Sequence, residues 1–264
     1  MSGHLRVGIE GVALLAPGLP DWATSQPILT GVQAYSPAPL VLPQPPELPP
    51  AERRRAIPSV KLAFTVAAAA VRMSGRSPQN LATVFASSGV DGETIEAILA
   101  VLTTPGREVS PTRFGNSVHN ATAGSWGLSM QCQEASTSVC AYDASFTAGL
   151  LEAATQVVAT ARPVLFVAYD LPYPGTLRTV RPLTGPFGAA FMLSPDRAGY
   201  ALRIDFTASD GNETGCTDAA LETLRAGNPA ARSLPLLIGI AKGQSDRVRL
   251  NLAKGGLLVD IEPC

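Results

Sequence analysis

The chain of 264 residues is apolar and nearly neutral, with 46% hydrophobic residues, 16% charged residues and a formal net charge of -1. This composition excludes a disordered chain and supplies enough apolar side chains for a large core. The near-zero charge argues against nucleic acid as the main ligand, because phosphate binding needs a basic face. Sparse charge also leaves much apolar surface, which favours burial against a partner subunit.

The first residues and the cysteines indicate where the protein resides. The N-terminus has no basic region that leads into a long apolar run, so no secretory signal is expected. The most apolar helical run, 62–71, is about half of the ~20 residues that a membrane span needs. The four cysteines form no CxxC or CxxxH pair, so we expect neither a zinc site nor a disulfide framework. These features predict a cytosolic protein.

The first quarter of the chain begins with a strand and then becomes irregular. Residues 5–15 alternate loosely and are rich in β-forming residues, which predicts a strand. Residues 16–50 show no regular pattern. Within them, the prolines of 37–50 exclude a regular helix or a central strand, because each proline removes a donor and fixes φ. We expect an extended surface segment there, followed by a buried helix that continues from Pro58 to about Ser74.

Strands and helices alternate through the middle of the chain. The expected strands are 81–88, 136–140 and 163–169, and the expected helices are 93–102, 116–130 and 144–159. Asp143 is expected to be the N-cap of the last helix. Strand pairs are expected at 189–194 with 200–208 and within 247–261, and a short helix at 219–226. This order predicts one α/β domain over residues 1–264, with a mixed sheet covered by helices.

The stretch 111–170 carries the candidate chemistry. Cys140 lies at a predicted turn between a strand and a helix, and His119 is one of only two histidines. A thiol acyltransferase or condensing enzyme would need these two side chains within hydrogen-bond reach, with the helix N-terminus favouring the thiolate. The alternative is that Cys140 packs as a small apolar residue before the turn.

Other patterns carry less chemistry. There is no GxGxxG, P-loop, GxSxG or HExxH motif, so no organic cofactor and no metal is implied. The basic patch at 53–55 is either a solvated turn or a binding point for an acidic carrier protein or phosphate. Recruitment of a carrier protein there would make the chain a scaffold. Solvation or helix capping is expected for five turn-flanking carboxylates: Asp91, Glu93, Asp205, Asp210 and Glu213.

Several segments, taken in order, resemble β-ketoacyl synthases over about residues 5–195. LRVGIEGVALLAPG resembles their opening strand, ERRRAIPSVKLAFTVAAAAV their second helix and LATVFASSGVDGE their second strand. NATAGSWGLSM resembles the interface segment, and STSVCAYDASFTAGLLEAATQVV with PVLFVAYD resembles the nucleophile turn, its helix and the next strand. The strings SVHN and DASFTAGLLEA are most similar to truncated, chain-length-factor-like ketosynthase homologues of aryl polyene and xanthomonadin-type pigment clusters.

The resemblance implies a thiolase-like fold, as half of a ketosynthase, without a catalytic residue of its own. The family takes its two further catalytic groups from H-G-T-G-T and G-H-N turns in its C-terminal half, and neither string occurs here. We expect the chain to end where that half would begin. The turn is also out of register with the family: counting back from Gly149 gives Ala141 as the nucleophile position, counting forward from the strand gives Asp143, and Cys140 satisfies neither count.

The resemblance further implies a chain-length factor that pairs with a complete β-ketoacyl synthase and forms one wall of its acyl pocket. In the family, the strand before the nucleophile turn pairs across the two-fold axis, so the expected interface elements are 116–130, 136–139 and the turn at Asp143. The partners are a catalytic ketosynthase subunit and an acyl carrier protein, and a homodimer is an alternative for the isolated chain. The expected pocket and interface residues are His119, Asn120, Gly124, Trp126, Cys140, Asp143 and Phe146.

Overall fold

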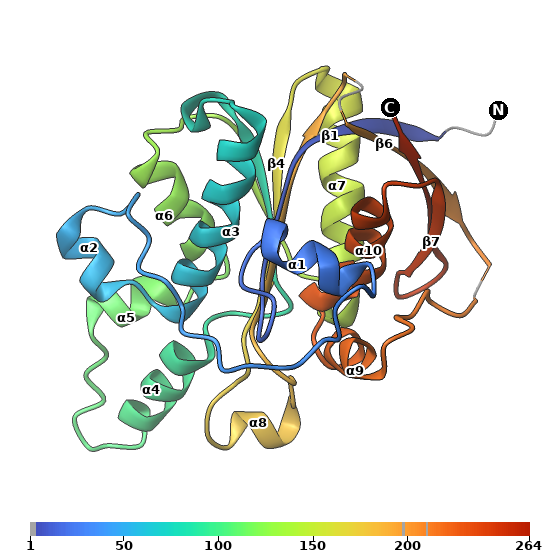
Figure 1. The fold of residues 1–264 in the computed structure, drawn as a ribbon. Helices are drawn as coiled ribbons and strands as arrows, with labels where there is room; N and C mark the ends of the chain where they lie inside the picture. Colours follow the sequence, from blue (N-terminus) through green and yellow to red (C-terminus); the bar gives the residue numbers. More distant parts are fainter. Residues whose placement is uncertain (1–3, 197–198, 210) are drawn as a thin grey trace.

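An eight-stranded mixed sheet forms the centre of the protein, as seen in a computed structural model that describes residues 4–196, 199–209 and 211–264 (Figure 1). The strand order is β3-β2-β4-β5-β1-β6-β8-β7. The strands are β1 (Leu5–Leu15), β2 (Ala82–Ala86), β3 (Ser136–Val139), β4 (Val164–Asp170), β5 (Phe187–Ser194), β6 (Tyr200–Thr207), β7 (Asp246–Asn251) and β8 (Gly256–Pro263).

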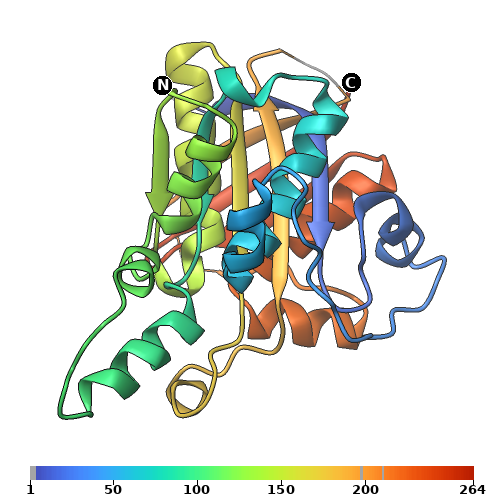
Figure 2. The ribbon, with the colours of Figure 1, turned by 90° about the vertical axis from the view of Figure 1, so that its left-hand side faces the viewer.

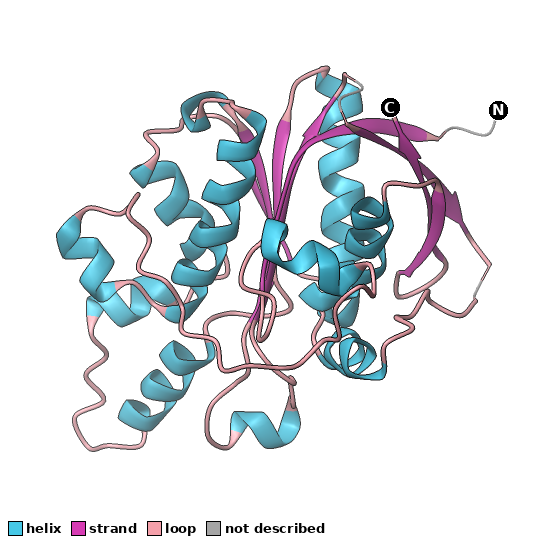
Figure 3. Cartoon of the chain, viewed as in Figure 1, coloured by secondary structure: helices cyan, strands magenta, loops and turns pink. Residues whose placement is uncertain are grey.

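Helices cover both faces of the sheet (Figure 3). On one face lie α3 (Pro58–Ser74) and α6 (Ala121–Ser129), and on the other lie α7 (Ser145–Thr160) and α10 (Leu234–Lys242). The remaining helices are α1 (Trp22–Leu29), α2 (Pro50–Arg55), α4 (Gly92–Leu102), α5 (Pro111–Asn116), α8 (Leu177–Val180), α9 (Ala219–Gly227) and the 3-10 turns η1 (Pro78–Asn80), η2 (Tyr142–Ala144) and η3 (Ala230–Ser233). No helix of the described residues combines the length and apolarity needed to cross a bilayer.

The strand β4 explains why the sheet needs both helical layers. All seven of its residues are buried. Phe166 faces the core on the α7 side, where it stacks on Phe191, and Leu165 faces the core on the α3 side. The near-continuous apolar run of this strand therefore matches a central position with both faces covered, as predicted.

Two predicted elements differ from the observed ones. The strands β5 and β6 do not pair with each other, because β1 lies between them and pairs antiparallel with both. The connection between them contains Arg197 and Ala198, which lie outside the described residues. Of the helix predicted at 116–130, only the part from Ala121 to Ser129 forms, as α6; residues 117–120 are not helical, and the separate helix α5 ends before them.

Helices α1 and α10, and the short helices α2, α5 and α8, fall where none was predicted. Helix α1 lies inside the segment 16–50 that was read as irregular, and it begins after Asp21, whose side chain accepts from the backbone N–H of Thr24. Helix α10 is almost wholly apolar and carries Pro235 in its first turn, so it lacks an amphipathic period. The strands β6, β8 and β7 curl past α10 and bury its apolar side chains (Figure 1).

The parallel part of the sheet positions the candidate site. The strand β2 pairs in parallel with both β3 and β4, so the carboxyl ends of all three strands meet at one edge of the sheet. Ligand sites of open α/β sheets commonly lie at such an edge. Here the edge carries the turn from β3 into α7.

Candidate functional site

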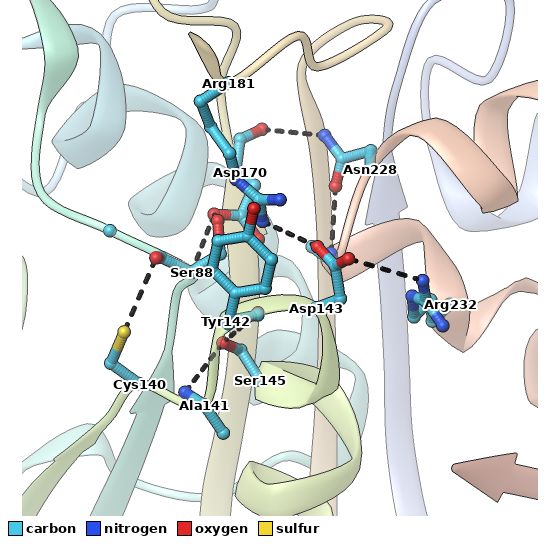
Figure 4. Close-up of polar contacts among 12 residues, drawn as sticks. Ser88, Cys140, Ala141, Tyr142, Asp143, Ser145, Asp170, Arg181, Asn228 and Arg232 are labelled. Atoms are coloured by element: carbon cyan, nitrogen blue, oxygen red, sulfur yellow. Dashed lines mark hydrogen bonds and ion pairs between the residues drawn. The ribbon is translucent and has the colours of Figure 1, made fainter. Parts of the chain in front are cut away.

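The candidate site is the turn between β3 and α7 (Figure 4). The loop that follows β2 and the carboxyl end of β4 lie beside this turn. Its apex is Tyr142, whose φ of 53° lies in the left-handed region that side chains rarely adopt. The backbone N–H of Ala141 donates to Ser145 Oγ at 3.0 Å, and Ser145 Oγ donates to the carbonyl of Tyr142 at 2.7 Å. These two bonds within the turn stabilise the strained apex.

The sequence did not predict Tyr142 as the apex of the turn. The two register counts give Ala141 and Asp143, which flank the apex. Nothing in an aromatic side chain indicates a positive φ, so the sequence carried no signal for this assignment. Tyr142 is 61% exposed, so its ring lies at the surface of the protein and not in the core.

Two arginines surround the apex. The guanidinium carbon of Arg181, at the end of α8, lies 3.7 Å from the ring centroid of Tyr142, and its Nη2 lies 2.7 Å from Asp143 Oδ1. Arg232, in η3, lies 3.9 Å from the other oxygen of Asp143. The prediction that Asp143 caps α7 is wrong: the N-cap residue is Ala144, and the carboxylate pairs with arginines instead of with the helix amides.

A carboxylate from the last quarter of the chain holds one of these arginines, Arg232. Glu213 Oε2 accepts from Arg232 and from Arg225, each at 2.7 Å, and the Glu213 side chain is only 9% exposed. The reading of Glu213 as a solvated or capping carboxylate is therefore wrong, because it is a buried bridge between two cations. Asp91 does cap α4, as expected, and Asp210 lies outside the described residues.

Asn228 makes a second connection from the same region. Its side-chain amide donates to the carbonyls of Gly185 at 2.7 Å and Asp170 at 3.3 Å. Asn228 and Arg232 reach the candidate site from a segment in which the sequence showed no functional pattern. Their roles depend on how the chain folds back, and a single sequence does not encode that contact in any local motif.

Cys140 and His119 lie at the same loop but bind different carbonyls. The thiol of Cys140 donates to the carbonyl of Ser88 at 3.4 Å, and His119 Nε2 lies 3.2 Å from the carbonyl of Ser87. In the described part of the chain no hydrogen bond joins the thiol to the imidazole. The pair that a thiol enzyme would need is therefore brought to one loop but not assembled.

Asp170, the last residue of β4, holds the loop of Ser87 and Ser88 in place. One of its oxygens accepts from Ser88 N, Ser88 Oγ and Ser87 Oγ at 2.8, 2.7 and 3.1 Å. Asp170 is only 3% exposed, and this burial raises the pKa of its carboxyl to about 6 although the bonds from Ser88 and Ser87 oppose the shift. The carboxylate thereby sets the two carbonyls that Cys140 and His119 contact.

The other expected pocket residues divide into two groups. Phe146 is fully buried beneath the turn, with ring centroids 5.6 Å from Phe166 and 6.1 Å from Phe191, so it fills the core between α7 and the sheet. Asn120, Gly124 and Trp126 instead line a groove of about 160 Å³ between α6 and β3. The structure thus places the two groups on opposite faces of the sheet.

The basic patch at 53–55 has a partly structural role. The guanidinium of Arg53 donates to the carbonyls of Pro46 and Leu48, which anchors the proline-rich segment against α2. Arg54 and Arg55 are exposed. A carrier-docking patch would therefore have two available cations instead of three.

A comparison with protein families decides the classification. The family described as beta-ketoacyl synthase, N-terminal domain, matches residues 23–244. The chain belongs to this family. A search of the curated proteins finds no match.

Solved ketosynthase structures share the fold. A chain of the complex of the ketosynthase ApeO with its chain length factor ApeC from Xenorhabdus doucetiae superposes with a TM-score of 0.72 and 24% identity, covering 98% of this chain and 99% of that one. A chain of the type II complex AntDE:AntF gives 0.75 and 11%, covering 99% and 100%. A β-ketoacyl synthase from Burkholderia phymatum STM815 gives 0.70 and 10%, covering 98% and 100%. The predicted ketosynthase-like, thiolase-type fold is confirmed.

Proposed function

We propose that this chain is a non-catalytic ketosynthase-like subunit that pairs with a complete β-ketoacyl synthase and acts as its chain-length factor. The observation that carries the proposal is the turn before α7. Its apex is Tyr142, which is covered by Arg181, and Arg181 is paired with Asp143.

A condensing reaction needs a nucleophilic thiolate and two further polar groups, and this turn does not bring them together. A thiolate must attack the acyl thioester, and two further polar groups must stabilise the charge that develops during decarboxylation. Cys140 lies before the apex, and its hydrogen bond runs to the carbonyl of Ser88. Among the described residues, the side chains that converge on the apex are two arginines and a carboxylate already paired with them.

The edge strand β3 is the proposed pairing surface. It ends the sheet, and no strand of the described residues pairs with its outer edge. An unpaired edge favours pairing with another chain. In the condensing enzymes that the chain resembles, the strand before the nucleophile turn pairs across the two-fold axis, which supports β3 as the contact.

The same proposal assigns the acyl pocket to the interface. The rings of Phe146, Phe166 and Phe191 fill the space between α7 and the sheet. An acyl chain would therefore extend along the boundary with the partner, where this subunit forms a wall and limits chain length. The ligand would be an acyl chain on a carrier protein, in an aryl polyene or xanthomonadin-type pathway of the cytosol, as the SVHN and DASFTAGLLEA strings suggest.

Co-expression with the complete β-ketoacyl synthases of the source organism tests the proposal. The expected result is a one-to-one complex with one of them by size-exclusion chromatography with light scattering. Failure to pair with every one of them would contradict the proposal. An acyl adduct on Cys140 after incubation with acyl carrier protein would favour the alternative, a thiol-dependent acyltransferase or condensing enzyme.

A further inference from the structure

The two edges of the sheet differ. The strand β3 forms one edge, as Figure 2 shows, and no strand of the described residues pairs with its outer side. The strand β7 forms the other edge. Its pairing with β8 directs the backbone groups of Arg247, Arg249 and Asn251 outward, because alternate residues of an antiparallel strand face its neighbour. Outward N–H groups of an edge strand are the donors with which a second chain can pair.

Side-chain oxygens already accept from all three of these outward N–H groups. The bonds run from Arg247 N to Asp246 Oδ1 at 2.8 Å, from Arg249 N to Thr214 Oγ1 at 2.8 Å and from Asn251 N to Glu213 Oε1 at 3.3 Å. A side chain that accepts such a bond satisfies the donor without presenting a further strand. The ladder of backbone hydrogen bonds therefore stops at β7.

Two of the three acceptors belong to residues 211–216, which we call the edge strap. Its backbone also contacts the strand, because Thr214 N donates to the carbonyl of Arg249 at 3.0 Å. A Cβ built on Gly211 would meet the guanidinium carbon of Arg249 at 2.8 Å, so the strap packs directly against β7. The strap is a loop and not a strand, so it covers the edge without offering a new one.

Glu213 anchors the edge strap to the body of the protein. Its Oε2 accepts from Arg225 of α9 and from Arg232 of η3, each at 2.7 Å, while its Oε1 accepts from β7. At the end of the strap, Cys216 N donates to Glu222 Oε2 at 2.7 Å. The strap is therefore held at two points besides its contacts with the strand.

We propose that the edge strap is a guard that prevents β3 of a second copy of this chain from pairing with β7. Pairing of β3 with β7 would repeat from copy to copy and build an open-ended array, because the two edges are different surfaces of the same molecule. With β7 covered, the sheet offers a single edge, and such a protein forms closed complexes. The inference goes beyond the proposed function, because it concerns the edge opposite to the proposed pairing strand.

Removal of two guard acceptors tests the inference on the isolated chain. Thr214→Val keeps the shape of the side chain but loses the hydroxyl oxygen, and Asp246→Ala removes the carboxylate. Light scattering across a concentration series should give one discrete mass for the wild type, whereas the mass of the double variant should rise at least about twofold. The matched control is Thr223→Val on α9, an exposed position whose hydroxyl donates to the carbonyl of Ala219, and it should behave as the wild type does.

Hydrogen exchange locates the contact, and it needs only the single variant Thr214→Val if the double variant does not fold. The amide of Arg249 should exchange about tenfold faster in dilute Thr214→Val than in the wild type. The amide of Val248, which faces β8, is the internal reference and should not change. In the associated double variant, the outward amides of β7 should regain protection, because a strand of the second copy now accepts from them.

Three results would overturn the inference. The first is a wild type whose mass grows with concentration while its outward β7 amides become more protected. The second is a double variant that keeps the wild-type mass at every concentration, or a Thr214→Val variant whose Arg249 amide exchanges as in the wild type. The third is association of the double variant while its outward β7 amides stay open to exchange. Failure of the chain to pair with a ketosynthase contradicts only the proposed function.

Discussion

The guanidinium of Arg181 lies over the ring of Tyr142, 3.7 Å from its centroid, and also donates to Asp143 at 2.7 Å. One cation thus contacts the apex of the turn and the residue after it. Because Arg181 comes from the end of α8 and Arg232 from η3, the turn is joined to two distant segments. A site of this kind is held in one shape by ion pairs and stacking.

Removal of that cation should loosen the turn. Arg181→Met keeps much of the apolar stem but loses the ion pair and the cation–π contact, and we expect a loss of about 1–2 kcal/mol in the free energy of unfolding. Hydrogen exchange at residues 140–146 should rise. The control is Arg178→Met on the same helix, because Arg178 is exposed and forms no ion pair among the described residues. Equal effects from both variants would contradict the assignment.

Two helix glycines should respond in opposite directions to the same change. Gly149→Ala places a Cβ 2.6 Å from Phe166 and 2.7 Å from Ala86, so we expect a loss of about 1–3 kcal/mol from overpacking. Gly124→Ala meets open space and should stabilise the isolated chain by up to about 1 kcal/mol. Chemical denaturation measures both values. A destabilised Gly124→Ala would indicate an internal role for that glycine.

The buried carboxyl of Asp170 predicts a pH dependence. Its folded-state pKa of about 6 lies above the usual value near 3.8, so between these values the folded protein binds a proton that the unfolded chain has released. The Asp170 contribution to stability therefore decreases as pH rises from about 4 to 6, by roughly 1–3 kcal/mol, and is constant outside this window. Asp170→Asn removes the titration.

The measurement is the difference in the free energy of unfolding between the wild type and Asp170→Asn across that window. The wild type should lose stability relative to the variant as pH rises from 4 to 6. A difference that stays flat, or one that changes in the opposite direction, would show that the carboxyl does not titrate as its burial implies. Ser88→Ala removes one donor to the carboxylate, so it should raise the folded-state pKa and extend the upper end of the window to higher pH.

Much of the fold was readable from local patterns. The apolar run of 163–169 predicted a central strand, and β4 is buried along its whole length. The alternating end of the chain predicted an edge pair, and β7 and β8 pair antiparallel at the edge of the sheet. These signals are strong because burial of one face of a strand produces an alternating pattern, and burial of both faces produces a continuous apolar run.

The remaining differences arise from tertiary context. The position of β1 between β5 and β6 depends on long-range pairing, which a turn between two strand patterns does not reveal. Helix α10 is buried by curled strands and so shows no polar face. In the site, the ion pair of Arg232 with Asp143 joins residues far apart in the chain, and the positive φ of Tyr142 follows from the turn instead of from its side chain.

Reconstituted condensation tests the non-catalytic role most directly. Two complexes are compared with the wild type: one carries Cys140→Ala in this chain, and the other carries Ala at the nucleophilic cysteine of the ketosynthase partner. We predict that Cys140→Ala leaves the rate of carbon–carbon bond formation from carrier-bound substrates within about twofold of the wild type, that the partner variant abolishes it, and that mass spectrometry finds acyl groups on the partner chain alone. Loss of condensation in the Cys140→Ala complex, with an acyl group found on Cys140 of the wild type, would contradict this account.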